Sequence, residues 1–533
     1  MNASSAPNMS AEDLRARITG TSELALLDVR ENGIFNTNHI LCARSVPLSR
    51  LEILIDDLLP RKSVPIVVCD AGGGLAEQAA ERLAGFGYSD ISVLAGGIDG
   101  WEDAGYVLFS GVNVPSKAFG EFVEHREHTP NISAEELHGL IEGDADLVVL
   151  DSRPYDEYHR MNIPTGIDAP GAELVYRVHD MAPDPATLVV VNCAGRTRSI
   201  IGAQSLINAG IPNKVMALTN GTMGWVLAGY ECGKGSIDVA PPPGDAGLAA
   251  AREAAARVTK RYGVNFTTMA EVDGWRGNDS RSLYLIDVRT SEEYEAGHLA
   301  GAIHAPGGQL VQGTDGFVGA LNARVVLIDD QVVRAVMSAH WLIQMGWTDV
   351  HVLDELGSAE LVQGAHSPNV YGLEGAGPDE VDAGELKSML DGGGTVVVDL
   401  ADSRAYGQGH IPGAWFAVRS RLATGLKALP EHENLVLTSE GGGVLAKLVA
   451  GEAAALSSAP VSVLSGGTAA WTAAGYELTT GPENLADEAD DVALKAYDGP
   501  GDAEARMQAY IDWELDLPRL IEEDGTSDFR TFE

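Results

Sequence analysis

The chain has 533 residues, and its 36 Lys and Arg against 77 Asp and Glu give a formal net charge of −41. That length suggests roughly three to five domains, and a hydrophobic share of 45% is ordinary for globular proteins. So acidic a chain repels phosphate backbones and anionic lipid, which argues against nucleic-acid or membrane partners.

Cysteine content and the N-terminus indicate the compartment. Four cysteines are too few for a disulfide scaffold, which favours a reducing compartment. The first residues, MNASSAPNMSAEDLRARI, contain no basic stretch followed by an apolar run, so we expect no secretory signal. The chain also has no apolar stretch long enough to span a membrane. We therefore expect a cytoplasmic protein.

One pattern recurs four times along the chain. An apolar strand ending in Asp is followed by a turn, a second apolar strand, a loop, an amphipathic helix and a third strand. The spacing between the first Asp and the residue at the end of the second strand is 42 residues in three copies and 40 in the last. These pairs are Asp28 and Asp70, Asp151 and Cys193, Asp287 and Asp329, and Asp399 and Ser439. Such regular spacing indicates a repeated domain.

Strands that alternate with helices predict an α/β fold. We expect four tandem domains, each a mainly parallel sheet flanked by helices on both faces. Ser10 and Ser133 each open a helical stretch with acidic residues after them, which is an N-cap pattern. The predicted boundaries are 9–108, 131–233, 266–362 and 378–480, followed by an acidic, helical C-terminal extension at 481–533.

The connecting segments predict how the copies associate. The linker between copies 2 and 3 contains Ala240 and three prolines, which indicates a stiff, exposed boundary. Its Ala-rich part is expected to form either a docking helix or a spacer. We therefore expect copies 1 and 2 to form one half and copies 3 and 4 another, with the C-terminal extension as a packed accessory helix and a frayed tail.

The loop after the second strand of copy 2 has the chemistry of a reactive site. Cys193 ends a strand and opens a tight loop before a helix, where backbone N–H groups and the helix dipole favour an anion. Arg196 and Arg198 add two positive charges. These effects predict a lowered pKa and a nucleophilic thiolate at Cys193.

The other candidates are weaker. Cys69 lies within a strand and is interpreted as a small buried hydrophobe, as are Cys42 and Cys232. In the other three copies Asp70, Asp329 and Ser439 stand at the position of Cys193. The two aspartates would repel an anion, and no base for Ser439 is visible in the sequence.

The repeat resembles the rhodanese homology domain. The matching features are the strand-Asp-x-Arg motif at Asp151 and Arg153, the GHIPGA turn that starts at Gly409, the strand-end loop and the Gly-Gly-x3-Trp ending before Trp471. The resemblance implies that only copy 2, with its loop from Cys193 to Arg198, is catalytic. It implies no metal and no cofactor.

The resemblance implies a sulfurtransferase with a Cys193 persulfide, taking sulfur from an anionic donor such as thiosulfate and passing it to a thiol or cyanide. Asp151 and Arg153 are predicted to support the loop structurally. The predicted substrate-binding residues are the rest of the loop: Ala194, Gly195, Arg196, Thr197 and Arg198. A protein acceptor and a homo-oligomer are left open.

Two alternatives are kept beside the sulfurtransferase. One is a multi-domain scaffold or persulfide-relay binding protein with little turnover. The other is a Cys-based phosphatase or arsenate reductase, which is disfavoured because the Cys193-x4-Arg198 loop is one residue shorter than the Cys-x5-Arg loop of those enzymes.

Overall fold

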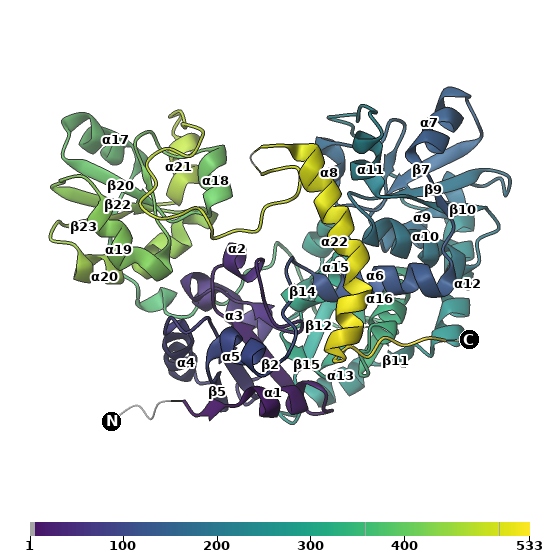
Figure 1. Cartoon of the computed structure of the whole chain (residues 1–533), viewed down its shortest axis with the longest axis horizontal. Coiled ribbons are helices and arrows are strands. Elements are labelled where there is room, and N and C mark those ends of the chain that lie inside the picture. The colour runs from purple at the N-terminus through teal and green to yellow at the C-terminus, as the bar shows by residue number, and fades with distance from the viewer. Residues whose placement is uncertain (1–5, 358, 500, 533) are drawn as a thin grey trace.

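The computed structural model describes residues 6–357, 359–499 and 501–532. It confirms four α/β domains in tandem (Figure 1), and long helices connect domain 1 to domain 2 and domain 2 to domain 3. Residues 1–5, on which the expectation of no secretory signal partly rests, lie outside the described residues, as do residue 358 of predicted domain 3 and residues 500 and 533 of the extension.

Domain 2 shows the architecture that the repeat shares. Its sheet has the order β6-β10-β9-β7-β8 with every pair parallel. The central strands are rich in Val and Leu because helices cover both faces. The strands are β6 Asn131–Ile132, β7 Leu147–Asp151, β8 Ile167–Asp168, β9 Leu188–Asn192 and β10 Val215–Leu218, and the helices are α7 Ala134–Glu142, α8 Tyr155–Arg160, α9 Glu173–Met181, α10 Thr197–Ala209 and α11 Gly221–Leu227.

Domain 1 repeats this order and gains a strand from domain 3 at its edge. Its strands are β1 Asn8–Met9, β2 Leu24–Asp28, β3 Arg44–Ser45, β4 Ile66–Cys69 and β5 Ile91–Leu94, and its helices are α1 Ala11–Ile18, α2 Asn32–Phe35, α3 Leu51–Leu58, α4 Leu75–Gly85 and α5 Gly97–Asp103. The predicted N-caps are confirmed: Ser10 accepts a bond from the Asp13 amide, and Ser133 forms a full capping box with Glu136.

Domains 3 and 4 have the same five-strand order. Domain 3 contains β11 Asn265–Thr267, β12 Leu283–Asp287, β13 His298–Leu299, β14 Ile303–His304, β15 Ala320–Leu321, β16 Arg324–Ile328, β17 Val350–Leu353 and β18 Leu361–Val362, with helices α13 Met269–Arg276, α14 Ser291–Ala296, α15 Gly307–Gln312 and α16 Val333–Gln344. Domain 4 contains β19 Asp379–Val381, β20 Thr395–Asp399, β21 Trp415–Phe416, β22 Asn434–Thr438 and β23 Val461–Leu464, with helices α17 Ala383–Gly392, α18 Ser403–Gln408, α19 Leu422–Gly425, α20 Val444–Leu456 and α21 Gly467–Ala473.

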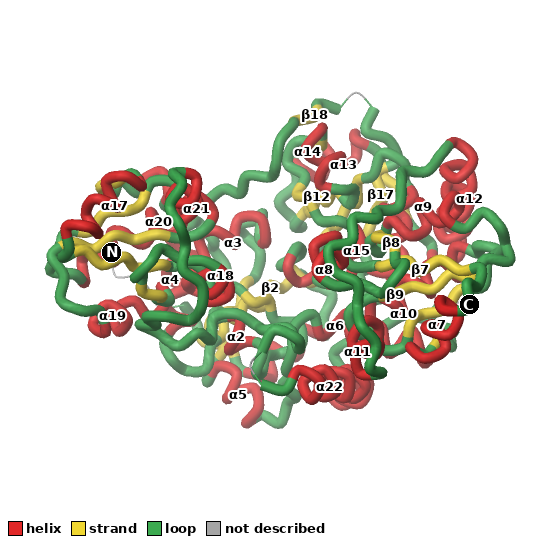
Figure 2. The backbone as a smooth tube through the Cα atoms, turned by 90° about the horizontal axis from the view of Figure 1, so that it is seen from above, coloured by secondary structure: helices red, strands yellow, loops and turns green. Residues whose placement is uncertain are grey.

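The expectation of two separate halves is wrong. Strand β15 of domain 3 pairs antiparallel with β2 of domain 1, so these two domains share a sheet. Ala240 is fully buried, and the Ala-rich linker forms α12 (Asp245–Tyr262), which packs between α9 of domain 2 and α16 of domain 3. Domains 1, 2 and 3 therefore form one body, and Figure 2 shows domain 4 beside domain 1.

Two further helices join the domains. Helix α6 (Val114–Glu127) connects domains 1 and 2, and α22 (Ala503–Asp524) returns from domain 4 to pack along α6 and α11. Figure 1 shows α22 as the yellow helix that crosses in front of α6. None of the described helices is both long and apolar enough to cross a membrane.

Candidate active site

Cys193 is the first residue after β9, at the edge of the sheet where ligands of open α/β sheets bind. It is 2% exposed, and its Sγ donates to Ser199 Oγ at 3.5 Å. Its carbonyl accepts from the Thr222 amide and hydroxyl, both at 2.8 Å. Gly221 must be glycine here, because its φ is +53° and a Cβ would lie 2.3 Å from that carbonyl oxygen.

The two Asp-containing copies reveal what this loop is built to hold. Asp70 accepts from the amides of Gly72 at 2.7 Å and Leu75 at 2.8 Å. Asp329 likewise accepts from the amides two and five residues further on, at 3.2 and 2.8 Å. The loop is therefore an amide cradle for an anion, and at the cradled position domain 2 carries the Cys193 sulfur.

The protonation of Cys193 differs from the sequence prediction. Burial raises the pKa of the thiol, while the charge of Arg198 and the hydrogen bonds of Ser199 lower it, and the net direction is upward. The prediction of a lowered pKa is therefore wrong for this closed arrangement, because desolvation outweighs the cationic loop.

Arg196 is bound by carboxylates of α6. Its Nε and Nη2 donate to Glu121 at 2.6 and 2.8 Å, Nη2 also contacts Glu124, and Nη1 donates to Asn220 Oδ1 at 3.0 Å. The Arg196 side chain is 8% exposed and that of Glu121 1%. The role of Arg196 as a substrate ligand stays a prediction. In this geometry Arg196 connects the loop to α6 through its ion pair with Glu121.

Arg198 is differently placed. Its Nη2 donates to Glu157 at 2.9 Å, whereas its Nη1 is buried and has no hydrogen-bond partner among the described residues. Burial alone would raise the pKa of Glu157, but Arg198 and Lys495 prevail and lower it to about 2. Arg198 thus carries one N–H group that is available to an anion.

Asp151 and Arg153 hold the strand end. Arg153 Nε and Nη2 donate to the two carboxylate oxygens of Asp151 at 2.8 and 2.7 Å, and both side chains are 1% exposed. Asn192, which precedes Cys193, donates to the same carboxylate at 2.8 Å. The geometry fits the predicted supporting role.

Helix α22 covers the loop. Ala194 lies in one apolar cluster with Met507 and Ile511, and Thr197 Oγ1 donates to Glu514 Oε1 at 3.3 Å. A Cβ on Gly195 would lie 3.1 Å from Glu514 Oε2. The sequence prediction treated this extension as accessory; the available signal was a Glu on the buried stripe of the helix, in register with Met507 and Ile511.

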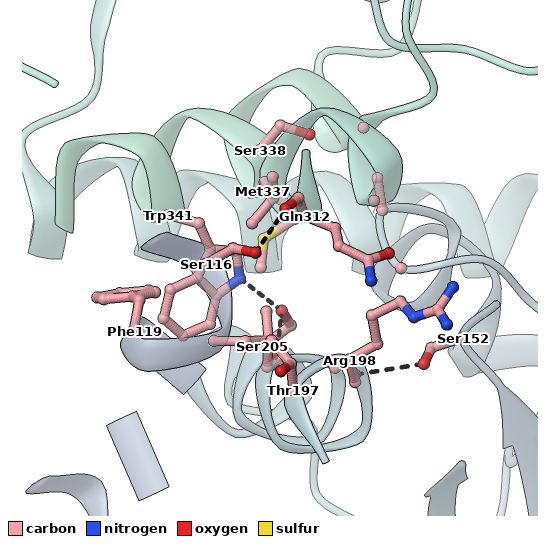
Figure 3. Close-up of a pocket in the computed structure, with 17 residues that line it drawn as sticks. Ser116, Phe119, Ser152, Thr197, Arg198, Ser205, Gln312, Met337, Ser338 and Trp341 are labelled. Carbon is pink, nitrogen blue, oxygen red and sulfur yellow. Dashed lines mark hydrogen bonds between the residues drawn. The ribbon is translucent and has the colours of Figure 1, made fainter. Parts of the chain in front are cut away.

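A cavity of about 40 Å³ lies beside the loop, between α6 and α10 on one side and α15 and α16 on the other. Figure 3 shows Arg198 and Gln312 directed toward the same space, with Ser152, Ser205 and Trp341 around it. Domain 3 therefore supplies part of the wall near the Cys193 loop. Among the described residues, no group of three or more His, Cys, Asp or Glu side chains could hold a metal ion.

The comparisons with known proteins agree with this geometry. The model of the rhodanese-like domain family matches residues 10–104, 133–228, 268–355 and 382–474. A crystal structure of thiosulfate sulfurtransferase from Pseudomonas aeruginosa is 47% identical over 99% of this chain and 100% of that one, with a TM-score of 0.94. The Alr3790 protein from Anabaena sp. is 30% identical over 20% of this chain and 93% of its own, with a TM-score of 0.19. No curated protein matches the chain. The family model matches well over half of the sequence, and the chain belongs to the rhodanese family, with four rhodanese-like domains in tandem.

Proposed function

We propose that the protein is a sulfurtransferase that moves sulfane sulfur from thiosulfate to a thiophilic acceptor through a persulfide on Cys193 of domain 2. The observation that carries this proposal is the amide cradle: the loop that binds a carboxylate at Asp70 and Asp329 holds a cysteine in domain 2. The rhodanese family and the thiosulfate sulfurtransferase from Pseudomonas aeruginosa support sulfur transfer as the activity.

In the first step the Cys193 thiolate attacks the outer sulfur of thiosulfate. The S–S bond of the donor breaks, and sulfite leaves with the bonding electron pair. The loop amides from Ala194 to Arg198 stabilise the resulting persulfide anion. The buried N–H of Arg198 is suited to a sulfonate oxygen, since charge-assisted hydrogen bonds to anions are strong.

Access to the sulfur requires movement. Cys193 is 2% exposed and α22 packs over the loop, so the donor reaches the thiol when this cover shifts. Hydration of the site removes the desolvation that raises the pKa of Cys193 and leaves the charge of Arg198 to favour the thiolate. We further propose a cytoplasmic location, with a small anionic donor and a thiol or cyanide acceptor as the partners.

Intact mass spectrometry after incubation with thiosulfate tests the proposal. We expect a gain of one sulfur atom, lost in Cys193→Ala and retained in Cys232→Ser, whose thiol is half-buried outside the loop. Absence of the gain in the wild-type protein would favour the scaffold alternative.

A further inference from the structure

Two polar atoms at the Cys193 loop are buried and lack a partner among the described residues. One is the Nη1 donor of Arg198, and the other is the Oε2 acceptor of Glu514, a residue that is 1% exposed. An unpaired buried polar atom costs free energy, so each such atom in a native structure calls for an explanation, and a catalytic role or a bound ligand is one of them. The sulfonate of the donor pairs the first but, being an anion, cannot pair the second.

Glu514 is held in place by its other oxygen. Glu514 Oε1 accepts from Thr197 Oγ1 at 3.3 Å and from Tyr510 Oη at 3.0 Å. These two bonds fix the carboxylate above the loop, with Oε2 next to Gly195. Its charge is a smaller contribution to the raised pKa of Cys193, after the desolvation that comes from burial.

The surrounding charges balance Glu514 without pairing Oε2. Lys117 of α6 is buried, and its ammonium lies over the rings of Tyr510 and Trp513 at 5.0 and 4.8 Å. Arg196 and Glu121, which also face Glu514, are tied to each other. Glu514 Oε2, next to Gly195 in the loop that carries Cys193, is therefore a buried acceptor with no donor among the described residues.

Resting on the proposed function, we propose that Glu514 of the C-terminal helix takes the proton of the acceptor, and that the acceptor is a neutral thiol. The acceptor sulfur attacks the outer sulfur of the Cys193 persulfide as its S–H proton passes to Glu514 Oε2. A new S–S bond forms on the acceptor, the Cys193–sulfur bond breaks, and the electron pair returns to Cys193 as the thiolate. The product leaves as a persulfide, and Glu514 releases its proton to water.

The test separates the two half-reactions. The protein is loaded with thiosulfate and freed of donor. Loss of the extra sulfur mass is then followed in single turnovers with 2-mercaptoethanol at neutral pH, where the thiol is protonated, or with cyanide at an alkaline pH where cyanide is the anion, and each variant is compared with the wild type at the same pH. In Glu514→Gln we expect discharge by the thiol to slow on the order of 100-fold, the usual range for a general base. Discharge by cyanide, which has no proton to give up, keeps the wild-type rate or exceeds it because an opposing charge is gone.

Matched variants complete the design. Glu504→Gln removes an exposed carboxylate from the first turn of the same helix and should leave both rates unchanged. Glu514→Asp keeps a carboxylate and should restore part of the thiol rate. Equal slowing with both acceptors, or no slowing with the thiol, overturns the assignment of Glu514 while leaving the persulfide intact. Failure to gain sulfur in the loading step instead overturns the proposed function.

Discussion

Replacing Arg196 should destabilise the protein far more than an ordinary surface arginine would. The Arg196–Glu121 pair is almost completely buried, and the Arg196→Ala substitution leaves the Glu121 carboxylate without its bidentate partner in a dry environment. Breaking a buried ion pair from one side costs about 3–5 kcal/mol, whereas changes at the surface usually stay within about 0.5 kcal/mol.

Calorimetry is the appropriate assay, because a chain of four domains need not unfold in one step. For a domain pair of this size, each kcal/mol shifts the melting temperature by about 2–4 °C, so the transition that contains domain 2 should fall by roughly 6 °C or more. Arg519→Ala, whose side chain is 61% exposed, serves as the control. The double variant Arg196→Met with Glu121→Leu should recover most of the loss, since apolar replacement of a buried pair is often neutral. If the Arg196→Ala variant has the same melting temperature as the Arg519→Ala control, the reasoning is refuted.

Three other outcomes follow from the structure. Gly221→Ala should abolish persulfide formation because its Cβ would strike the Cys193 carbonyl, whereas Gly229→Ala, with φ +85° but no atom within 4 Å, should cost only backbone strain; intact mass distinguishes them. Burial lowers the pKa of Lys117 from 10.5 to about 8, so between these pH values the unfolded chain binds more protons than the folded one. This residue therefore makes the free energy of unfolding rise with pH in that range, and Lys117→Met should flatten the rise in melting experiments at different pH. The fragment 1–235, which contains copies 1 and 2, should be poorly folded by circular dichroism and inactive in thiosulfate turnover, because α12, α16 and α22 bury its helices.

The repeat made the fold and the strand-end position of Cys193 predictable. Strand periodicity and the spacing between strand ends identify the sheet edge, and that edge places Cys193 and Asp151 from local sequence alone. The partners of Arg196 and Thr197 could not be predicted, because Glu121 lies on a connecting helix and Glu514 follows more than 300 residues later. Contacts of such long separation leave no local pattern, and for the same reason β15 was not expected in the sheet of domain 1. Burial of Cys193 was not predictable either, and the resulting desolvation raises the pKa of its thiol where the sequence predicted a lowered one.

Domain 3, whose loop carries Asp329 at the position of Cys193, is built into the environment of domain 2. Domain 3 contributes β15 to domain 1 and, through Gln312 and Trp341, lines the cavity that Arg198 faces. Its own cradle is closed by Arg334, which is fully buried and pairs with Asp329 at 2.9 Å, so the carboxylate there is neutralised from within the loop. Arg334 also reaches across to Glu173 of domain 2 at 3.1 Å, so the silent loop serves as an interdomain contact. In this copy the anion cradle therefore has a structural use, in which a fixed carboxylate and arginine join domains 2 and 3 near the Cys193 loop.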